Sequence, residues 1–525
     1  MVAAENDGLP KAKVGGIGDV VRDVPLALAR LCCNVEVVIP SYGFLHNLPG
    51  SQFLKTVTYK FAGEQDEAKV YEIPGKVLHA NVKQLLIDHP RFISHDKDGR
   101  YEIYHPDPKE RPFATDASKY ARFCMAVAEA VKQGVFEKPD CIHLHDWHAA
   151  FLLVIRQYLI DYQVLQAIRI AYTIHNLALQ GVRPFSGDES SLESWYPEIK
   201  YDRDKLADPR WSDCENPMEV GIQLADAVHT VSLSYAEEIL KPSDKERGYY
   251  GGEGLESFLL AAKNEGRLFG ILNGCEYPTD RNVAKLNFPD LLNLLKSGIV
   301  QWAGKQESLS ASHFVAYARI TKLISLPTPP IILTSVTRIT DQKTLLMKPL
   351  GELRDNGGHR SKSGLEQILE GLGTRGIYIL LGTGSEADER FLTEVSSRFE
   401  NFAFLNGFSD DCAKALYANG DLFLMPSSFE PCGISQMLAM RDGQPCVVHN
   451  VGGLKDTVKD NVNGFTFEGY SLEEQVRNFV ETCLKAINLK LERPIKWQEI
   501  CENARKERFL WEVTVKQYID SLYKR

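Results

Sequence analysis

The stretch Pro426-Ser-Ser-Phe-Glu-Pro-Cys-Gly-Ile-Ser435 decides how this chain is interpreted. It follows a run typical of a buried strand, 421–425, and precedes a run with helical character, 434–441. Glu430 therefore lies in a strand-to-helix turn, with Gly433 at the start of the helix. The free N–H groups of a helix start suit a phosphate, and a neighbouring acid can bind a sugar hydroxyl. An ordinary loop of an α/β domain is the alternative.

A second glycine-rich loop lies near the N-terminus, Lys13-Val-Gly-Gly-Ile-Gly-Asp19. Glycines let the backbone approach a ligand closely, and Lys13 can reach a phosphate. Apolar residues follow at helical spacing, and we expect Pro25 to mark the first turn of that helix. The spacing fits neither the dinucleotide fingerprint nor the Lys-Ser/Thr phosphate loop, so a plain tight turn is the alternative.

Composition narrows the class of protein. The 525 residues suffice for two or three domains, and 44% hydrophobic with 25% charged content is that of a soluble globular chain. A net charge of −10 argues against a nucleic-acid partner. The eleven cysteines form no Cys-x-x-Cys pair and lie in apolar runs, which indicates buried thiols in a reducing compartment. No segment has the pattern of a membrane span or of a signal sequence, so no membrane partner is expected.

Short apolar strands alternate with helical stretches in both halves of the chain, which predicts parallel sheets with ligands at the carboxyl ends of the strands. The expected strands of the first half are 35–40, 142–145, 169–174 and 227–231, and those of the second are 331–336, 377–381, 403–405, 422–425 and 446–448. Between the halves, the stretch from Asn273 to about Thr328 is polar and less regular, and it leads into Pro329-Pro330.

Taken together, the two loops resemble those of the bacterial and plant glycogen and starch synthases, which transfer glucose from ADP-glucose. Val14 replaces the usual threonine of the first loop. Five further segments extend the resemblance along nearly the whole chain: His143-Leu-His-Asp-Trp-His-Ala149, Tyr172-Thr-Ile-His-Asn-Leu-Ala-Leu-Gln-Gly181, Gly270-Ile-Leu-Asn-Gly274, Ser335-Val-Thr-Arg-Ile-Thr-Asp-Gln-Lys343 and Leu380-Leu-Gly-Thr-Gly384. Seven segments in order are far more specific than any one of them.

The resemblance implies the GT-B architecture, two Rossmann-like domains with parallel sheets facing across a deep cleft. It divides the chain into an N-terminal acceptor-side domain (1–272), an inter-domain linker (273–328), a nucleotide-sugar domain (329–508) and a final helix (509–525) that crosses back onto the first domain. Residues 1–5 look like the end of a first strand, and relatives usually carry several more apolar residues there, so we expect an earlier start.

The resemblance also implies how the donor is bound. Arg338 and Lys343 would clamp the diphosphate and neutralise the charge that grows as the nucleotide leaves. Phe408 would place its ring against adenine, and a core phenylalanine is the alternative. A surface pair is the alternative for Arg338 and Lys343. The turn before the predicted helix would cap the distal phosphate: Cys432, Gly433, Ile434 and Ser435.

The sugar-facing roles follow from the same resemblance. Glu430 would bind hydroxyls of the transferred glucose, and His175 would face the sugar near its C6 hydroxyl. Asp146 would steady positive charge on the sugar or orient the acceptor. Asn273 would contact the sugar or serve as a hinge. In the first glycine loop, Lys13 would add charge from the opposite domain, and Gly15 and Gly16 would bind the substrate.

The implied reaction is α-1,4-glucosyl transfer to glycogen, starch or a maltooligosaccharide, with retention and no evident carboxylate nucleophile. Same-face attack, helped by the leaving phosphate, is then expected. The resemblance requires no metal or other cofactor. A metal reading of His143, His145, Asp146 and His148 is weak because alternate side chains along a strand face opposite ways. The aromatic stretch 188–213 lines a glucan groove or, as we favour, packs as an ordinary long loop.

Three positions depart from the family pattern: Ser428 replaces an arginine, Leu438 replaces the second glutamate of the wider GT-B group, and His449 begins a less basic run. These departures bear on nucleotide affinity or donor choice. A non-catalytic glucan-binding paralogue, a phosphorylase and another retaining GT-B transferase with a different nucleotide sugar or acceptor are the rivals. The expected location is the cytoplasm, or the plastid stroma if the source is a plant or alga and a transit peptide is missing.

Overall fold

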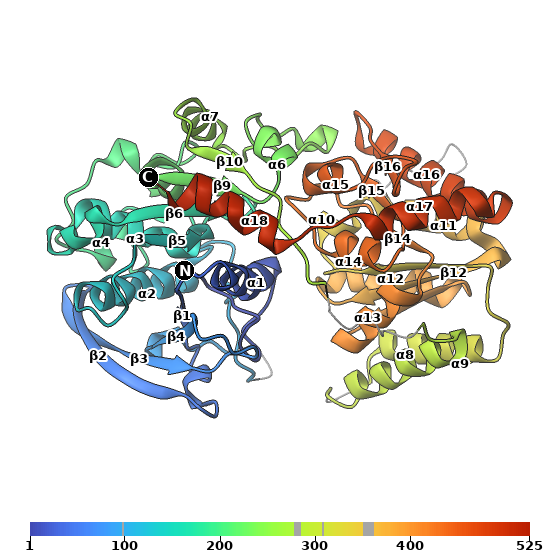
Figure 1. The fold of residues 1–525 in the computed structure, drawn as a ribbon, viewed down its shortest axis with the longest axis horizontal. Coiled ribbons are helices and arrows are strands. Elements are labelled where there is room, and N and C mark those ends of the chain that lie inside the picture. The colour runs from blue at the N-terminus through green and yellow to red at the C-terminus, as the bar shows by residue number, and fades with distance from the viewer. Residues whose placement is uncertain (97–98, 278–284, 307–308, 350–361, 525) are drawn as a thin grey trace. The chain divides into compact units, whose positions relative to one another are not determined.

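The computed structural model describes residues 1–96, 99–277, 285–306, 309–349 and 362–524. The chain forms two compact units (Figure 1). Unit 1 consists of Met1–Ser243, Gly251–Gly274 and Leu510–Arg525, and unit 2 consists of Asp244–Tyr250 and Cys275–Phe509. Each unit has its own sheet with a hydrophobic core on both faces.

Unit 2 contains a six-stranded parallel sheet in the order β13-β12-β11-β14-β15-β16. The strands are β11 (Ile331–Val336), β12 (Gly376–Gly382), β13 (Phe402–Asn406), β14 (Leu422–Met425), β15 (Cys446–His449) and β16 (Phe465–Phe467). Five of the six were predicted as apolar runs, because a strand covered on both faces is apolar throughout. The strand order reverses between β11 and β14, and ligands of doubly wound sheets bind at that point.

Helices cover both faces of the unit 2 sheet: α8 (Phe288–Ala303), α9 (Ala311–Ile324), α10 (Asp341–Thr344), α11 (Gly364–Leu372), α12 (Glu386–Arg398), α13 (Asp410–Asn419), α14 (Ser435–Arg441), α15 (Gly452–Thr457), α16 (Leu472–Glu492) and α17 (Pro494–Lys506). The stretch 273–328, expected as a less regular linker, contains α8 and α9. Their buried faces, including Leu292, Leu295 and Ile320, belong to the core of unit 2.

Unit 1 contains two four-stranded sheets that Val2 joins into one, since Val2 bridges both Val38 and Leu144. The strands are β1 (Val35–Pro40), β2 (Gln52–Phe61), β3 (Glu64–Ile73), β4 (Val82–Asp88), β5 (Cys141–His145), β6 (Arg169–Ile174), β9 (Ala227–Thr230) and β10 (Leu268–Gly270). Residues 1–5, expected to end a first strand, pair with the sheet only through the isolated bridges of Val2. The short strands β7 (Arg183–Pro184) and β8 (Cys214–Glu215) pair separately.

An antiparallel hairpin was not predicted from the sequence. Strands β2 and β3 are joined by Ala62 and Gly63, whose φ angles of 54° and 78° suit a tight hairpin turn. Most side chains of the first half of β2 are exposed, so its apolar pattern is weak. Strand β3 then pairs antiparallel with β4, which extends the sheet away from the parallel strands.

The helices of unit 1 are α1 (Gly16–Arg30), α2 (Ala114–Lys132), α3 (Asp146–Tyr158), α4 (Leu192–Trp195), α5 (Pro217–Leu224), α6 (Leu233–Glu238), α7 (Glu256–Asn264) and α18 (Trp511–Gln517). The expectation that Pro25 marks the first turn of α1 is wrong, because Pro25 lies inside that helix. The buried side chains of Val20, Val21 and Val24 keep the preceding turns helical although Pro25 lacks an N–H donor.

The C-terminal segment packs on unit 1, where Figure 1 shows α18 as the red helix beside the strands. Trp511 Nε1 donates to Asp23 Oδ2 at 3.0 Å, and Thr514 Oγ1 donates to the Leu272 carbonyl at 2.8 Å. A π-helical turn, Tyr518–Tyr523, follows α18, and Arg169 Nε donates to the Leu522 carbonyl at 2.7 Å. These bonds fix the last residues against β6 and the end of β10.

No helix in the described ranges is long and apolar enough to cross a bilayer. All eleven cysteines are free thiols.

Two buried carboxyl groups make the stability of unit 1 depend on pH. Burial raises the pKa of Glu215 and of Glu219 to about 8, from an ordinary value of 4.5. The folded chain therefore holds these protons at pH values where the unfolded chain has released them. Their contribution to stability is complete below the unfolded pKa and is lost as pH rises through the folded pKa. Buried histidines such as His175, with a pKa near 3, make stability rise with pH instead. They do so only below about pH 6.5, where a histidine of the unfolded chain is protonated.

We therefore expect the free energy of unfolding to fall between about pH 6.5 and 8, by up to about 1.4 kcal/mol per pH unit for each such group. Glu215→Gln should flatten this decline, measured by urea unfolding at several pH values. Glu198→Gln, whose side chain is 78% exposed, is the control and should leave the slope unchanged. An unaltered slope in Glu215→Gln would show that Glu215 is not a protonated buried acid.

Candidate functional site

The centre of the unit 2 site is an ion pair at the switch point of the sheet. Lys343 lies in α10, after β11, and Glu430 lies in the turn between β14 and α14. Lys343 Nζ donates to Glu430 Oε2, with the two side chains only 11% and 8% exposed. Ser427 Oγ donates to the same carboxylate oxygen at 3.0 Å. Each buried charge is thus compensated by the other, as burial requires.

The loops that carry this pair are tied together by hydrogen bonds. Gln342 Nε2 donates to the Phe429 carbonyl at 2.8 Å, and the Ser428 N–H donates to the Gln342 carbonyl at 2.8 Å. The Gly453 N–H donates to the Glu430 carbonyl at 3.1 Å. Glu430 is therefore held from three directions, which fixes where its carboxylate points.

Two further predicted residues lie at the carboxyl ends of the same strands. Arg338 follows β11, its side chain is exposed, and it forms no ion pair within the described residues. Phe408 follows β13 and is 54% exposed, which excludes the alternative of a core phenylalanine. Its backbone is fixed from behind, because Trp302 Nε1 donates to the Phe408 carbonyl at 3.1 Å. Gly407 packs against the same indole, which a Cβ would approach to 2.2 Å.

The turn 432–435 exposes backbone donors next to Glu430. Gly433 has a φ of 77°, a conformation that glycine adopts without strain. Gln436 Nε2 donates to the carbonyls of Cys432 and Gly433, which turns those carbonyls inward. Over the described chain, no acceptor is assigned to the N–H groups of Gly433, Ile434 and Ser435, which lie at a partly exposed surface. These donors can hold an anion.

The departures at 428 and 449 have structural roles. Ser428 is buried and donates to Gln342, so it joins the two loops. His449 is also buried, stacks on Phe467 at 5.1 Å, and lies 3.1 Å from the Ser427 carbonyl through Nδ1. Burial lowers the pKa of His449 to about 4, so the ring is neutral and donates to that carbonyl. His449 thereby positions Ser427 and adds no charge.

In unit 1, Asp146 and His175 lie together after β5 and β6. Asp146 has a φ of 55°, which a residue other than glycine rarely adopts, and its Oδ1 accepts the His175 N–H at 2.7 Å. Burial raises the pKa of Asp146 to about 7, although this backbone bond and one from Asn176 oppose the shift. A strained, buried acid at the carboxyl edge of a sheet is typical of a functional residue.

The His175 ring is buried enough that its pKa falls to about 3, so it is neutral at physiological pH. Its Nε2 lies 3.0 Å from Nδ1 of His145. The loop that follows is anchored by Gln180, whose Oε1 accepts from Arg210 at 2.6 Å and from Asn216 at 2.7 Å. The His175 ring is therefore positioned by His145, and the loop after it is positioned through Gln180.

The N-terminal glycine loop already holds a carboxylate. Glu5 Oε2 accepts the N–H groups of Val14 and Gly15 at 2.6 Å each, and Gly16 begins α1. Lys13 Nζ donates to Asp19 Oδ1 at 2.6 Å and lies 3.6 Å from Asp7. Lys13 must release these acids before it can contact a phosphate.

Asn273 is buried near the end of the second segment of unit 1, and its Oδ1 has no hydrogen-bond partner in the described chain. The aromatic stretch is mostly structural, as favoured from the sequence: Trp195 and Tyr196 are in the core, and Tyr201 stacks on Phe185 at 5.4 Å. Trp211 is the exception, with 52% of its surface exposed.

The structure brings Lys343 together with Glu430 in unit 2, and Asp146 together with His175 in unit 1. Sequence reasoning missed the partners that hold these residues, namely Ser427, Gln342, Glu5 and His145. It also missed Tyr250, whose ring lies 4.5 Å from that of Phe429, next to Glu430. These contacts join residues far apart in the chain, and no local pattern signals them.

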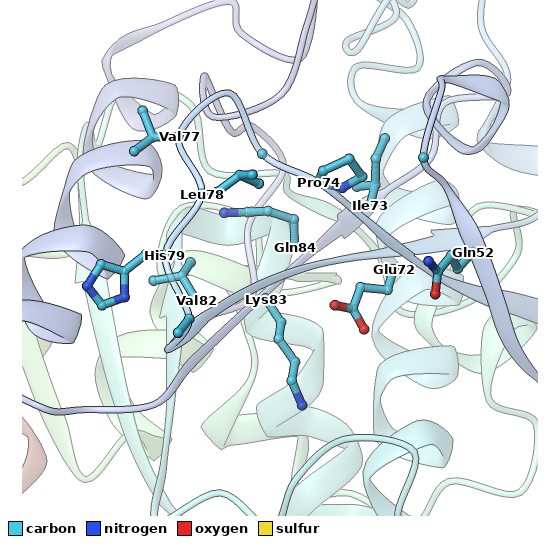
Figure 2. Close-up of a pocket in the computed structure, with 13 residues that line it drawn as sticks. Gln52, Glu72, Ile73, Pro74, Val77, Leu78, His79, Val82, Lys83 and Gln84 are labelled. Atoms are coloured by element: carbon cyan, nitrogen blue, oxygen red, sulfur yellow. The ribbon is translucent and has the colours of Figure 1, made fainter.

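A cavity of about 620 Å³ lies elsewhere in unit 1 (Figure 2). Figure 2 shows Val77, Leu78 and His79 on one side and Gln52 and Glu72 on the other. None of the predicted site residues lines it. Because it is open and lacks the charged groups described above, its size does not make it the functional site.

Comparison with known proteins places the chain in a family. The starch synthase catalytic domain matches residues 1–261, and glycosyl transferases group 1 matches residues 378–507. A glycogen synthase of Streptococcus equi subsp. equi is 32% identical, covering 100% of this chain and 98% of that protein. A glycogen synthase of Lactiplantibacillus plantarum is 31% identical, covering 98% and 97%.

The chain belongs to the glycogen and starch synthase family. The catalytic domain of starch synthase IV from Arabidopsis thaliana, in a structure bound to ADP and acarbose, superposes with a TM-score of 0.72 at 26% identity, covering 99% of this chain and 97% of that one. The fold is therefore GT-B, with two Rossmann-like domains, and the protein is a glucosyltransferase that elongates a glucan.

Gly181 tests whether the loop after His175 depends on close packing. Its φ is 71°, and a Cβ would lie 2.2 Å from the Trp147 ring. We expect Gly181→Ala to lower the free energy of unfolding by roughly 2–4 kcal/mol, from backbone strain and overpacking together. Gly187→Ala is the matched control, because its φ is 81° but a Cβ would meet nothing within 4 Å. Equal losses in chemical denaturation would refute the packing argument.

Proposed function

We propose that this protein transfers glucose from ADP-glucose to an α-1,4-glucan with retention of configuration. The observation that carries the proposal is the buried Lys343–Glu430 pair at the switch point of the unit 2 sheet. A diphosphate needs a cation, and the hydroxyl groups of glucose need a hydrogen-bond acceptor. Lys343 supplies the first and the Glu430 carboxylate supplies the second, side by side. The ADP and acarbose bound to the Arabidopsis starch synthase are ligands of the same two chemical kinds.

Unit 2 is proposed to bind the donor. Arg338, which has no ion pair within the described ranges, and Lys343 would hold the diphosphate, and the N–H groups of Gly433, Ile434 and Ser435 would contact the distal phosphate beside Cys432. The exposed ring of Phe408 would stack on the adenine. These cations act most strongly when the departing nucleotide gains charge, so they favour the transition state over the ground state.

Glu430 is proposed to orient the glucose. When Lys343 turns to the diphosphate, the Glu430 carboxylate loses its ionic partner and accepts hydrogen bonds from sugar hydroxyls in exchange. Ser427 and the loop bonds keep the carboxylate in place during this exchange. Donor binding and sugar orientation are therefore coupled through one lysine.

Unit 1 is proposed to serve the sugar and the acceptor. His175 is neutral and would hydrogen-bond the glucose near its C6 hydroxyl. Asp146, where ionised, would stabilise positive charge on the sugar ring or orient the acceptor. Lys13 would leave Asp19 to add positive charge beside the donor phosphate, and the backbone of Gly15 and Gly16 would contact the substrate. Asn273 would use its unpartnered Oδ1 toward the sugar.

The proposed step needs no covalent enzyme intermediate. The acceptor hydroxyl oxygen bonds to C1 of glucose on the face from which the phosphate oxygen departs, and the C1–O bond to ADP breaks. The proton of the acceptor hydroxyl passes to the phosphate oxygen released from C1. ADP leaves with that proton, and the acceptor oxygen becomes the neutral oxygen of the new glycosidic bond. Positioning and electrostatic stabilisation supply most of the rate. The free thiols support a reducing compartment, and we propose the cytoplasm.

The test incubates the purified chain with labelled ADP-glucose or UDP-glucose and a maltooligosaccharide. We expect chain elongation with ADP-glucose as the preferred donor. Arg338→Ala and Lys343→Ala should each lower turnover by about 30- to 1,000-fold, because each removes a charge that acts in the transition state. Glu430→Ala should lower turnover while sparing ADP affinity.

Arg390→Ala removes an exposed arginine with only a helix-surface pair, and it should transfer glucose like the wild type. The proposal fails if Arg338→Ala retains near-normal turnover at an unchanged melting temperature. A wild type that elongates no glucan from either nucleotide sugar would favour the non-catalytic, glucan-binding alternative.

A further inference from the structure

A row of buried histidines continues inward from His175, and the proposed function uses only its outer end. His143 and His145 lie on β5, and His229 lies on β9, which β6 separates from β5 in the sheet. The rings of His143 and His145 stack at 4.3 Å, and those of His145 and His175 stack at 5.3 Å. All but His175 are fully shielded by the fold.

The inner half of this row has defined proton positions. The Ile271 carbonyl can only accept, so His229 donates to it from Nε2, at 3.2 Å, and its Nδ1 accepts from the Thr173 hydroxyl at 2.9 Å. Thr173 in turn accepts from His143 Nε2 at 2.6 Å. His143 Nδ1 then accepts from the Tyr523 hydroxyl at 2.8 Å. With both rings neutral, each ring nitrogen of His143 and His229 has one partner, and Thr173 Oγ1 accepts one hydrogen bond and donates the other.

Burial agrees with neutral rings. It lowers the pKa of His229 to about 4 and that of His143 well below its ordinary value. The pKa of His145 is also lowered well below its ordinary value, by burial and by the neighbouring histidines. A neutral imidazole carries one proton, so each ring has one donor and one acceptor nitrogen.

His145 has two nitrogens in unlike surroundings. Its Nδ1 lies 3.0 Å from His175 Nε2, whereas its Nε2 is buried with no partner among the described residues. A proton on Nε2 would bury an unpaired N–H donor, which folded proteins rarely tolerate. A proton on Nδ1 is used in the bond to His175 and leaves only a bare acceptor nitrogen unpaired. The second arrangement is therefore the more stable one.

We propose that His145 is a positioning residue, which donates from Nδ1 to His175 Nε2 and so fixes the proton of His175 on Nδ1. This deepens the proposed function, since it makes His175 a hydrogen-bond donor toward the sugar. Asp146 holds the backbone of His175 at the same time, through the 2.7 Å bond to its N–H. The ring and the backbone of His175 are thus fixed by consecutive residues of one segment.

The direct test is the imidazole ¹⁵N spectrum of the wild-type protein without substrate, with His175 assigned by comparison with His175→Gln. We expect His175 to be neutral, with Nδ1 protonated and Nε2 acting as an acceptor. A His175 protonated on Nε2 overturns the proposal. This measurement needs no variant of His145 and no activity, so it remains decisive even if the proposed function fails.

Two variants then test the consequence for transfer. His145→Leu removes the donor, and we expect kcat to fall by roughly tenfold to a hundredfold with little change in the KM for ADP-glucose. His145→Asn places an amide N–H near the position of Nδ1 and should recover most of that loss. Tyr523→Phe is the matched control, because it removes a buried bond at the other end of the row and leaves the His145–His175 bond intact.

The proposal is supported if His145→Leu also shifts the proton of His175 away from Nδ1 while Tyr523→Phe does not. It is overturned if His145→Leu and Tyr523→Phe lower kcat equally, since both would then act through stability alone. If His145→Leu does not fold, the wild-type ¹⁵N spectrum alone carries the decision. Absence of transfer by the wild type would refute the proposed function and leave the tautomer assignment standing.

Discussion

The buried ion pair between Lys343 and Glu430 is the interaction on which the proposed donor site depends. Neither charge is stable alone in that position, because burial without a partner costs several kcal/mol. The pair therefore requires the two loops after β11 and β14 to lie together, and Gln342 ties them through Phe429 and Ser428. The reversal of strand order between β11 and β14 makes that meeting possible.

The same pair would let the proposed site accept two chemical groups. In the structure, the cation and the carboxylate satisfy each other. In the proposed function, a nucleotide sugar would offer each of them another partner, the diphosphate for Lys343 and the hydroxyl groups for Glu430. In unit 1, the loop of Lys13 follows the same rule, because Asp19 and Glu5 occupy its donors in the structure. Internal acids thus stand in the places that an anionic ligand would take.

Much of the fold is predictable from the sequence because parallel strands buried on both faces are continuous apolar runs. β6 and β11 were predicted with their observed limits for this reason. The hairpin of β2 and β3 was not, since one face of β2 is exposed. Helices α8 and α9 were missed because each mixes a polar face with an apolar face. The apolar faces are buried in the core of unit 2.

The sequence motifs indicate candidate site residues but not the residues that hold them in place. Motifs indicated Glu430, His175 and Lys343, yet the partners of these residues lie elsewhere in the chain. His145 meets His175 across a separation of 30 residues, and Gln342 meets Phe429 across 87. Such contacts depend on which strands become neighbours, and that information is in the folded sheet rather than in local spacing.

The measurement that tests this account most directly is the affinity for ADP, by calorimetry, of the wild type, Lys343→Met and Glu430→Gln. If Lys343 passes from Glu430 to the diphosphate, Lys343→Met should weaken ADP binding by about tenfold or more, the loss of one charge-assisted bond. Glu430→Gln should bind ADP as tightly as the wild type or more tightly, because Lys343 no longer has to leave an ionic partner. An equal loss of ADP affinity in both variants would contradict the account.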